Sequence, residues 1–524
     1  MGGHAVPAEP GSPVPAAPTA PRPLHVHFLG ICGYAVSGAA LLAQQLGHVV
    51  TGSDEQAYPP VSDIVTEAGI RWENSHDPAN LDRWGVPDLV VVGNQVRPHN
   101  EEWLEARRRG LPISSEIEFY VSLTEGRLRL SVCGTHGKTT TSALLIHMLA
   151  RCGMDPGFRL GSTSLDLGGS ARLGTGPFVF EGDEYTTAPW DPRPKFLHTR
   201  PAAACVTRLE WDHPDVYPSP EAYRAPFVQL AQAMPPEGLL MLCADDPDAL
   251  ALGVHARCRV AVYGEGEEAD WRVTRLGDDG AVQRFRVDCR ELSVPEVSLT
   301  FPGRHNALNA TAALALATFA GARIDGCVQA CADFRGPARR FEILGTAGGI
   351  TVVDDYAHHP TEAWAAINAA RARYGRARII AVHTPHTYSR TLTLLEDYRK
   401  SFVEADVVVL GPIEAARERH LPATVSSADV AERITGRELH LVADSAEGVD
   451  LVLRLARPGD VVVVLSLGGF DKIARRIHAA LVEREGDAAT GRSRVDADAG
   501  TEPAGHGAPE ESPAGDPHPG DAHG

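Results

Sequence analysis

Residues 133–140, Cys-Gly-Thr-His-Gly-Lys-Thr-Thr, form a glycine-rich turn between two stretches of different character. The stretch 128–133 before the turn, Leu-Arg-Leu-Ser-Val-Cys, is typical of a strand, and the spacing of apolar residues in 138–151 after it is typical of a helix. In a turn of this kind, backbone N–H groups and the positive end of the helix can face phosphate oxygens. The stretch therefore predicts a phosphate site in an α/β domain.

The spacing within the turn is shorter than usual. The common phosphate loop has four residues between its first glycine and the Gly-Lys pair, whereas only Thr135 and His136 separate Gly134 from Gly137. A tight glycine turn without a ligand is the alternative interpretation, but packing does not explain a Lys-Thr-Thr-Thr run at a helix start.

Composition limits the class of protein. The chain has 524 residues, 43% hydrophobic and 22% charged, which is ordinary for a globular protein of about three domains. A net charge of −19 argues against a nucleic-acid partner, because phosphates would be repelled without a basic patch. The apolar runs, such as 461–467, are too short to span a bilayer, so we expect buried parallel strands and no membrane insertion.

The nine cysteines are scattered, and none forms a Cys-x-x-Cys pair. Neither a zinc site nor a disulfide framework is indicated, and a reducing, cytoplasmic compartment is expected. Residues 1–23 are rich in proline and lack an apolar core, so they do not resemble a signal peptide.

Strands and helices alternate between two low-complexity tails. We expect an α/β fold of three consecutive domains, with disordered tails at 1–23 and 486–524. The domains are a Rossmann-like one at 24–126, a P-loop ATPase-like one at 127–335 and a Rossmann-like one at 336–485. Within the second, 258–300 predicts hairpins with a turn at Asp278-Asp279-Gly280. Within the third, the sequence after Pro360 predicts a helix over 361–374.

The Gly-Thr-x-Gly-Lys-Thr spacing resembles the loop of the Mur ligases, ATP-dependent enzymes that join a carboxylate to an amine. The resemblance runs from about 24 to 480 and is closest to the branch that acts on UDP-N-acetylmuramate. The other stretches that carry it are HFLGICGYAVSG at 27–38, FEGDEYTTAPWDPRPKF at 180–196 with LEWDHPDVY at 209–217, FPGRHNALNATAALA at 301–315, and RRFEILG at 339–345 with VVDDYAHHPTEA at 352–363.

This resemblance implies ATP and Mg²⁺ as cofactors. The expected ATP-binding residues are Gly134, Thr135, His136, Gly137, Lys138, Thr139, Thr140, Asn306, Asn309, Arg340 and Asp355, with His305 facing the nucleotide as well. The expected metal ligands are Thr139, Glu181 and His213, among which the oxygen donors suit magnesium better.

The resemblance also places the UDP part of the substrate in the first domain, near Gly30, Gly33, Gly38, Asp54 and Asn94. The three glycines would allow close approach to the pyrophosphate. Taken alone, this glycine pattern would fit a dinucleotide-binding enzyme equally well.

The implied reaction is an ADP-forming ligation through an acyl phosphate, in peptidoglycan precursor synthesis or recycling. The residues expected to carry it are Lys138, Glu181, His213, Arg340 and His358. Tyr356, His358 and Arg390 are expected to face the incoming amine.

Two amines compete within this branch, namely L-alanine and the tripeptide L-alanyl-γ-D-glutamyl-meso-diaminopimelate. SDEQAYPP at 53–60 and LGGF at 467–470 resemble the tripeptide enzymes, whereas HPTEAWAAI and TPHTYSRT at 384–391 resemble the alanine ligases. Thr387 stands where the alanine ligases have the first of two arginines. A paralogue that makes an amide in secondary metabolism is a further alternative. A folylpolyglutamate-type ligase would lack the 24–126 domain, and a non-catalytic relative would be expected to lose Lys138 or the metal ligands.

Overall fold

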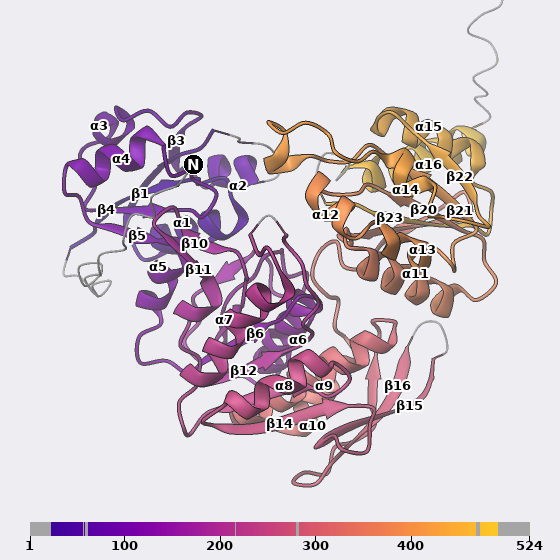
Figure 1. The fold of residues 1–524 in the computed structure, drawn as a ribbon, viewed down its shortest axis with the longest axis horizontal. Coiled ribbons are helices and arrows are strands. Elements are labelled where there is room, and N and C mark those ends of the chain that lie inside the picture. The colour runs from indigo at the N-terminus through magenta and orange to yellow at the C-terminus, as the bar shows by residue number, and fades with distance from the viewer. Residues whose placement is uncertain are drawn as a thin grey trace, which may run out of the picture.

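The computed structural model describes residues 22–55, 57, 61–214, 216–278, 282–467 and 472–490. The chain is an α/β protein with three large sheets that follow one another in sequence (Figure 1). In that view the parts that contain the first and third sheets lie on either side, and the part with the second sheet lies below them. This agrees with the expected fold class of three consecutive α/β units.

The first sheet has five parallel strands in the order β3-β2-β1-β4-β5. Apolar side chains from α1, α2 and α5 cover one face, and those from α3 and α4 cover the other. Its elements are β1 (His25–Leu29), α1 (Tyr34–Gln45), β2 (Val49–Ser53), α2 (Val61–Glu67), β3 (Arg71–Glu73), α3 (Asn80–Arg83), β4 (Leu89–Val92), α4 (Glu101–Arg108), β5 (Ile113–Ser115) and α5 (Glu116–Leu123).

The second sheet has ten strands in the order β17-β16-β15-β14-β13-β12-β6-β9-β7-β8. Helices α6, α9 and α10 pack on one face, and α7 and α8 on the other. Its strands are β6 (Arg129–Cys133), β7 (Gly157–Arg159), β8 (Ala171–Arg172), β9 (Phe178–Glu181), β12 (Ala203–Val206), β13 (Leu239–Cys243), β14 (Arg259–Gly264), β15 (Trp271–Asp278), β16 (Gln283–Cys289) and β17 (Val297–Leu299). A separate hairpin is formed by β10 (Thr186–Ala188) and β11 (Asp191–Pro194). The helices are α6 (Lys138–Arg151), α7 (Pro220–Ala233), α8 (Pro247–Ala251), α9 (Arg304–Phe319) and α10 (Ile324–Cys331), with short 3₁₀ turns η1 (Lys195–His198) and η2 (Leu252–His255).

The third sheet has six strands in the order β18-β19-β23-β20-β21-β22, and only β18 runs antiparallel to its neighbour. Its strands are β18 (Glu342–Ala347), β19 (Ile350–Asp355), β20 (Ile379–His383), β21 (Val407–Leu410), β22 (Glu438–Leu441) and β23 (Val461–Leu465). The helices are α11 (Pro360–Tyr374), α12 (Tyr388–Thr393), α13 (Tyr398–Ser401), α14 (Ser427–Ala431), α15 (Ser445–Leu455) and α16 (Ile473–Thr490), with 3₁₀ turns η3 (Leu395–Asp397) and η4 (Ala416–Glu418).

Several local predictions are confirmed. The apolar run at 461–467 contains β23, whose five residues are all buried between two parallel neighbours. The stretch 258–300 contains two antiparallel pairings, β15 with β16 and β16 with β17. Helix α11 begins at Pro360, where a capping box with Glu362 satisfies its first N–H groups.

Other predictions are wrong or fall outside the described residues. Helix α16 continues to Thr490, so the chain is still helical past 486, where the disordered tail was expected to begin. Residues 1–21, 491–524, Asp279 and Gly280 of the expected turn, and most of LGGF at 467–470 lie outside the described residues. Among the described helices, none combines the length and apolarity needed to cross a membrane.

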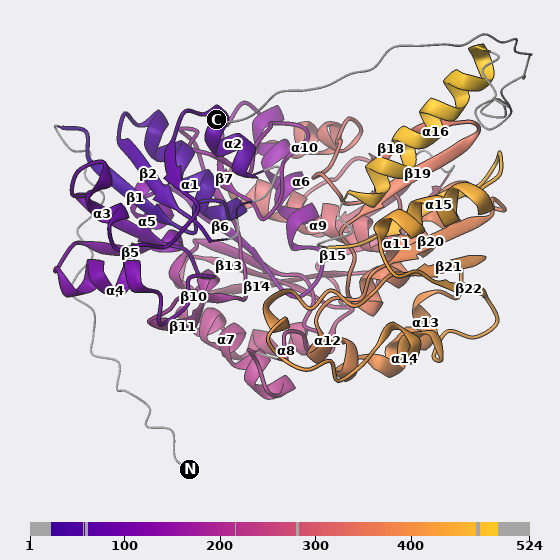
Figure 2. The same ribbon diagram turned by 90° about the horizontal axis from the view of Figure 1, so that it is seen from above.

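The second and third parts share one hydrophobic core. A single buried cluster runs from Leu144 and Leu149 of α6 through Phe334 and Phe341 to residues of α11 and β23. Figure 1 and Figure 2 both show α11 on the side of the third part that faces the second part. This packing brings the start of α11 toward the loop that precedes α6.

Candidate active site

A cavity of about 870 Å³ lies between the second and third parts of the molecule. The predicted phosphate loop contributes Thr135 to Thr140 to its wall. The other expected residues that line it are Glu181, His213, His305, Asn306, Asn309, Arg340, Asp355, Tyr356 and His358. Residues from four distant stretches of sequence therefore meet around one space, which is large enough for a nucleotide.

The two loop glycines combine a positive φ with close contacts to other parts of the chain. Gly134 has φ +120°, and a Cβ there would lie 2.5 Å from Thr207 Oγ1 and 2.8 Å from the carbonyl oxygen of Arg208. Gly137 has φ +83°, and a Cβ there would lie 2.6 Å from Asn309 Oδ1. Gly134 itself does not line the cavity. Its small size lets the loop pack against the segment that follows β12.

Lys138 sits at the start of α6 with its ammonium group among oxygen atoms. Its Nζ donates to the carbonyl oxygens of Gly134 and Thr135 at 2.7 and 3.0 Å and forms an ion pair with Glu184 at 2.9 Å. Burial alone would lower the pKa of Lys138, but Glu184 and the nearby Glu181 and Asp183 outweigh it and raise the pKa. The side chain is therefore a fixed positive charge at the loop.

A group of oxygen donors lies next to this lysine. Thr139 donates its hydroxyl hydrogen to Glu181 at 2.6 Å, and the backbone N–H of Gly161 donates to the other Glu181 oxygen at 2.7 Å. His213 Nε2 lies 3.1 Å from Glu184. A hydroxyl, two carboxylates and an imidazole thus face one space, and this donor set fits a hard divalent cation such as Mg²⁺.

The third part of the molecule contributes Arg340, Asp355, Tyr356 and His358. The guanidinium of Arg340 lies over the ring of Tyr356, 5.1 Å from its centroid. Burial raises the pKa of Asp355 to about 6, although this carboxylate accepts hydrogen bonds from the N–H groups of Phe341 and Ala357. Burial lowers the pKa of His358 to about 3, so its imidazole is neutral at physiological pH.

His305, Asn306 and Asn309, which were expected to face the nucleotide, lie at the N-terminal end of α9. Asn309 donates to Asn306 at 3.1 Å, and Asn306 donates to the carbonyl oxygen of Pro302 at 2.6 Å. Burial lowers the pKa of His305 to about 4. These polar groups are held in place by one another at the cavity wall.

The expected UDP residues lie in the first part, away from this cavity. Gly30 and Gly33 form the turn before α1, and Asp54 accepts a hydrogen bond from the N–H of Cys32 at 2.9 Å. Asn94 follows β4 at the same edge of the sheet. Gly38 packs tightly against protein, because a Cβ there would lie 2.7 Å from the Tyr120 hydroxyl and 2.9 Å from Ala171. Its lack of a side chain permits this packing.

Arg390, which was expected to face the incoming amine, is buried and paired in this structure. Its guanidinium forms two hydrogen bonds with the carboxylate of Asp212, with Nε–Oδ1 and Nη2–Oδ2 distances of 2.7 and 3.2 Å. It also contacts His386 and His213, and its side chain is 2% exposed. Arg390 does not line the cavity, so in this arrangement it has no free face for the carboxylate of an amino acid.

Polar contacts tie the phosphate loop to the third part. His136 lies between two carboxylates, with Nε2 2.9 Å from Glu210 and Nδ1 3.2 Å from Glu362. Thr361 donates its hydroxyl hydrogen to Glu210 at 2.8 Å. Burial would lower the pKa of His136, but the two carboxylates raise it to about 9.

The sequence interpretation missed Glu184, Asp212, Glu210 and Glu362. Glu184 and Asp212 stand inside motifs that were recognised, GDEY and WDH, so their closeness to Glu181 and His213 was an available signal. Glu210 and Glu362 act by contacts with His136 that span 74 and 226 positions, which no local pattern shows.

Comparison with known proteins gives matches along nearly the whole described chain. Three family models match in order, described as "Mur ligase family, catalytic domain" at 25–127, "Mur ligase middle domain" at 132–317 and "Mur ligase, glutamate ligase domain" at 339–468.

Curated relatives include UDP-N-acetylmuramate–L-alanine ligases from two bacteria. The one from Roseiflexus sp. (strain RS-1) is 37% identical over 469 residues, which cover 85% of this chain and 96% of that protein. The one from Kineococcus radiotolerans is 39% identical over 468 residues, covering 88% and 96%.

Solved structures agree with these relatives. The UDP-N-acetylmuramate–alanine ligase of Thermotoga maritima superposes with a TM-score of 0.72 at 25% identity, covering 88% of this chain and all of that one. A murein peptide ligase from Psychrobacter arcticus gives 0.66 at 27% identity, covering 88% and 99%.

Proposed function

The chain belongs to the Mur ligase family, and on that premise we propose that it joins UDP-N-acetylmuramate to L-alanine in an ATP-dependent, ADP-forming reaction of peptidoglycan precursor synthesis. The observation that carries the proposal is the cavity itself, where the phosphate loop, Glu181, His213 and Arg340 line one space. The relatives that share 37 to 39% of its residues over most of the chain are L-alanine ligases.

The reaction proceeds in two steps. A carboxylate oxygen of the nucleotide sugar attacks the γ-phosphorus of ATP, the bond to the bridging oxygen breaks, and ADP leaves. The product is an acyl phosphate. The nitrogen of the amine then attacks the carbonyl carbon and loses a proton, phosphate leaves, and an amide remains. Catalysis of this kind depends on positioning and on balancing negative charge.

Lys138 has the role of placing a positive charge beside the transferred phosphoryl group. The raised pKa of its ammonium supports this role, because the charge persists across the physiological range. Arg340 would add a second positive charge from the third part of the molecule. Asn306 and Asn309 would bind the nucleoside end, and Asp355 would orient the nucleotide from the opposite wall.

Mg²⁺ is part of this proposal. Thr139, Glu181 and His213 would hold it, with Glu184 beside them, and the oxygen-rich donor set described above fits the ion. When bound, Mg²⁺ supplies positive charge to the phosphate oxygens.

His358 would receive the incoming amine together with Tyr356. Its Nδ1 lies 3.0 Å from the carbonyl oxygen of Tyr356, so Nδ1 carries the hydrogen and Nε2 keeps a lone pair. The low pKa of His358 keeps this lone pair available at neutral pH. The imidazole can therefore accept a hydrogen bond from the amine and orient it.

The UDP moiety is assigned to the first part, at Gly30, Gly33, Gly38, Asp54 and Asn94. A cytoplasmic location also belongs to the proposal and is supported by the nine cysteines, all of which are free thiols. The domain limits 24–126, 127–335 and 336–485 remain predictions. Each of the three sheets falls within one of these ranges.

The surroundings of Thr387 and Arg390 favour the tripeptide as a second candidate for the amine substrate. Thr387 carries no charge and Arg390 is paired with Asp212, so neither is free to hold the carboxylate of L-alanine. A larger amine substrate would make contacts elsewhere.

The test is ADP release by the purified protein with Mg²⁺, ATP and UDP-N-acetylmuramate. L-alanine, glycine, L-serine and the tripeptide are compared, and the amide is identified by mass. We expect L-alanine to give the highest kcat/KM and Lys138→Ala to reduce ADP release to background while the protein stays folded. Absence of ADP above background with every amine would overturn the proposed substrate class, and a preference for the tripeptide would reassign the amine.

A further inference from the structure

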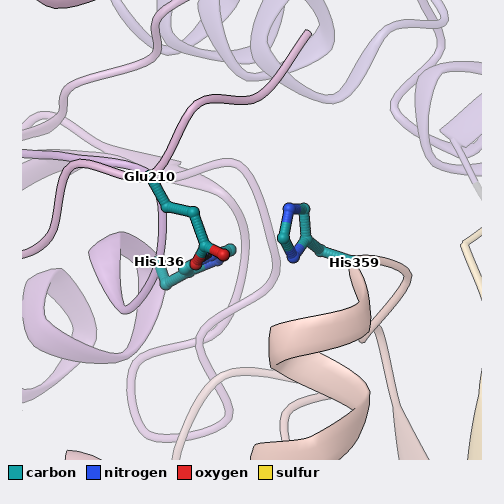
Figure 3. Close-up of side chains that lie close together, drawn as sticks. All are labelled: His136, Glu210 and His359. Atoms are coloured by element: carbon teal, nitrogen blue, oxygen red, sulfur yellow. Dashed lines mark hydrogen bonds and ion pairs between the residues drawn. The ribbon is translucent and has the colours of Figure 1, made fainter. Parts of the chain in front are cut away.

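Three potential metal ligands meet where the phosphate loop contacts the third part of the molecule. They are His136 of the loop, Glu210 from the segment after β12 and His359 at the start of α11 (Figure 3). One donor atom from each lies within 4.8 Å of the other two. The rings of His136 and His359 have centroids 4.9 Å apart. Glu210 and His359 do not line the ATP cavity, and His136 stands between that cavity and this cluster.

The Nε2 atom of His359 is buried without a partner among the described residues. The side chain is 1% exposed, and its Nδ1 accepts a hydrogen bond from the N–H of Thr361 at 3.2 Å. Buried nitrogens are nearly always paired, so a group without a partner beside two other donors points to a missing ligand.

We propose that His136, Glu210 and His359 bind a divalent transition-metal ion of the zinc class. Two imidazoles and one carboxylate form a donor set that Zn²⁺ accepts with a fourth position left open. Mg²⁺ prefers oxygen ligands and would not compete here. With Zn–N bonds of about 2.0–2.1 Å, ligand atoms on one ion lie about 3.4 Å apart, so the widest separation must shrink by about 1.4 Å through side-chain rotation.

Metal binding changes the protonation of both histidines. His136 is an imidazolium between two carboxylates, and metal binding releases the hydrogen from its Nε2 to solvent. The Nδ1–H of His136 keeps its hydrogen bond to Glu362. A metal-bound histidine is usually oriented by such a bond from its other nitrogen. In His359 the hydrogen moves from Nε2 to Nδ1, and the hydrogen bond from Thr361 is lost. The metal bond replaces this helix cap.

Such an ion would join the ATP loop to α11 and hold the second and third parts of the molecule together. In an enzyme that must open to release products, this would slow turnover. The effect on turnover rests on the proposed function, whereas metal binding does not.

The test uses the full chain without nucleotide or Mg²⁺, titrated with Zn²⁺ against a chromophoric chelator. His359→Asn removes Nε2 while its side-chain oxygen can still cap α11. His255→Asn, at an exposed histidine in η2, is the matched control. We expect wild type and His255→Asn to hold one Zn²⁺ that His359→Asn binds more than about 100-fold more weakly. Any zinc bound by histidines of the tails would be the same in all three proteins, so it would not contribute to the difference in zinc binding between them.

Equal zinc binding by wild type and His359→Asn would overturn the proposal. Should His359→Asn fail to fold, Glu210→Gln replaces it, because the amide can still accept from Thr361. A zinc-soaked crystal gives a second readout, in which an anomalous peak is expected within bonding distance of all three side chains. A peak elsewhere would also overturn the proposal. Because no substrate is present, these outcomes are independent of whether the ligase reaction is correct.

Discussion

The guanidinium of Arg390 is almost completely buried, and Asp212 balances its charge from a different part of the chain. Burial raises the desolvation cost of both groups, and their mutual attraction offsets it, so the pKa of Asp212 stays well below its usual value. His213 follows Asp212 in the chain, and its Nδ1 accepts a hydrogen bond from the same guanidinium at 3.0 Å. This pair therefore fixes a residue of the proposed metal site through a contact between the second and third parts.

Removing one partner should be costly. Asp212→Ala leaves a buried, unpaired guanidinium and should lower the free energy of unfolding by about 3–5 kcal/mol. The double variant Asp212→Leu/Arg390→Met should lose less, because no charge is left uncompensated. Denaturant titration measures both.

The exposed pair of Glu396 with Arg399 supplies the control, since Glu396→Ala should hardly move the transition. A double variant less stable than Asp212→Ala would contradict this account of Arg390.

The site residues that belong to a local sequence motif were predictable. Lys138, Thr139 and Glu181 lie around one space as expected, because short spacing fixes the loop and strand β9 pairs directly with β6. The partner of Arg390 was not predictable. It lies 178 positions away, and a lone arginine looks the same in sequence whether it faces a substrate or a buried aspartate.

At the scale of elements, the phosphate loop depends on backbone that approaches other backbone closely. Gly134 combines a positive φ with contacts that a methyl group would violate, whereas Gly153, just after α6, has φ +75° and nothing within 4 Å of a Cβ. The two glycines belong to the same strand–loop–helix unit and differ mainly in these contacts.

Gly134→Ala should therefore displace the loop and reduce ATP binding by more than tenfold, since Arg208 backbone atoms cannot move aside easily. Gly153→Ala should cost only the strain of a left-handed residue, about 1 kcal/mol, and leave ATP binding unchanged. Equilibrium binding of a non-hydrolysable ATP analogue distinguishes the two. Equal losses would mean that φ strain alone explains both variants.

Elements with a clear period or turn signal were predicted well, including α6, α11 and the hairpins after residue 258. The packing at Gly38 was not predictable. A glycine in a nucleotide-binding pattern can serve a ligand or a packed helix, and its closeness to Tyr120, 82 positions away, depends on the tertiary fold. The expected start of the tail at 486 falls inside α16, because composition indicates a tail without marking the residue at which a helix stops.

At the scale of the whole molecule, the arrangement of the second and third parts rests on a shared hydrophobic core and on the contacts of His136. None of this was visible in sequence, since it depends on how separate sheets pack. The raised pKa of His136 makes part of this arrangement sensitive to pH.

The sign follows from the direction of the shift. The folded pKa of about 9 exceeds the ordinary value of 6.5, so protonated His136 stabilises the fold fully below about pH 6.5, and this contribution is lost as pH rises through 9. The difference in Tm between wild type and His136→Asn should shrink between pH 6.5 and 9.5 in calorimetry. The pKa values of Asp354 and Asp355 are raised to about 6, so these groups titrate below the pH range of this comparison. A difference that stays constant across it would show that His136 is not charged between its two carboxylates.

The central claim is that the cavity transfers a phosphoryl group from ATP to a carboxylate before the amine attacks. It is tested most directly with UDP-N-acetylmuramate carrying ¹⁸O in its carboxyl group, incubated with Mg²⁺, ATP and L-alanine. An acyl phosphate passes one carboxyl oxygen to the phosphate that leaves, so the account predicts one ¹⁸O atom in each inorganic phosphate released and ADP as the nucleotide product. Phosphate without ¹⁸O, or AMP with pyrophosphate, would contradict it.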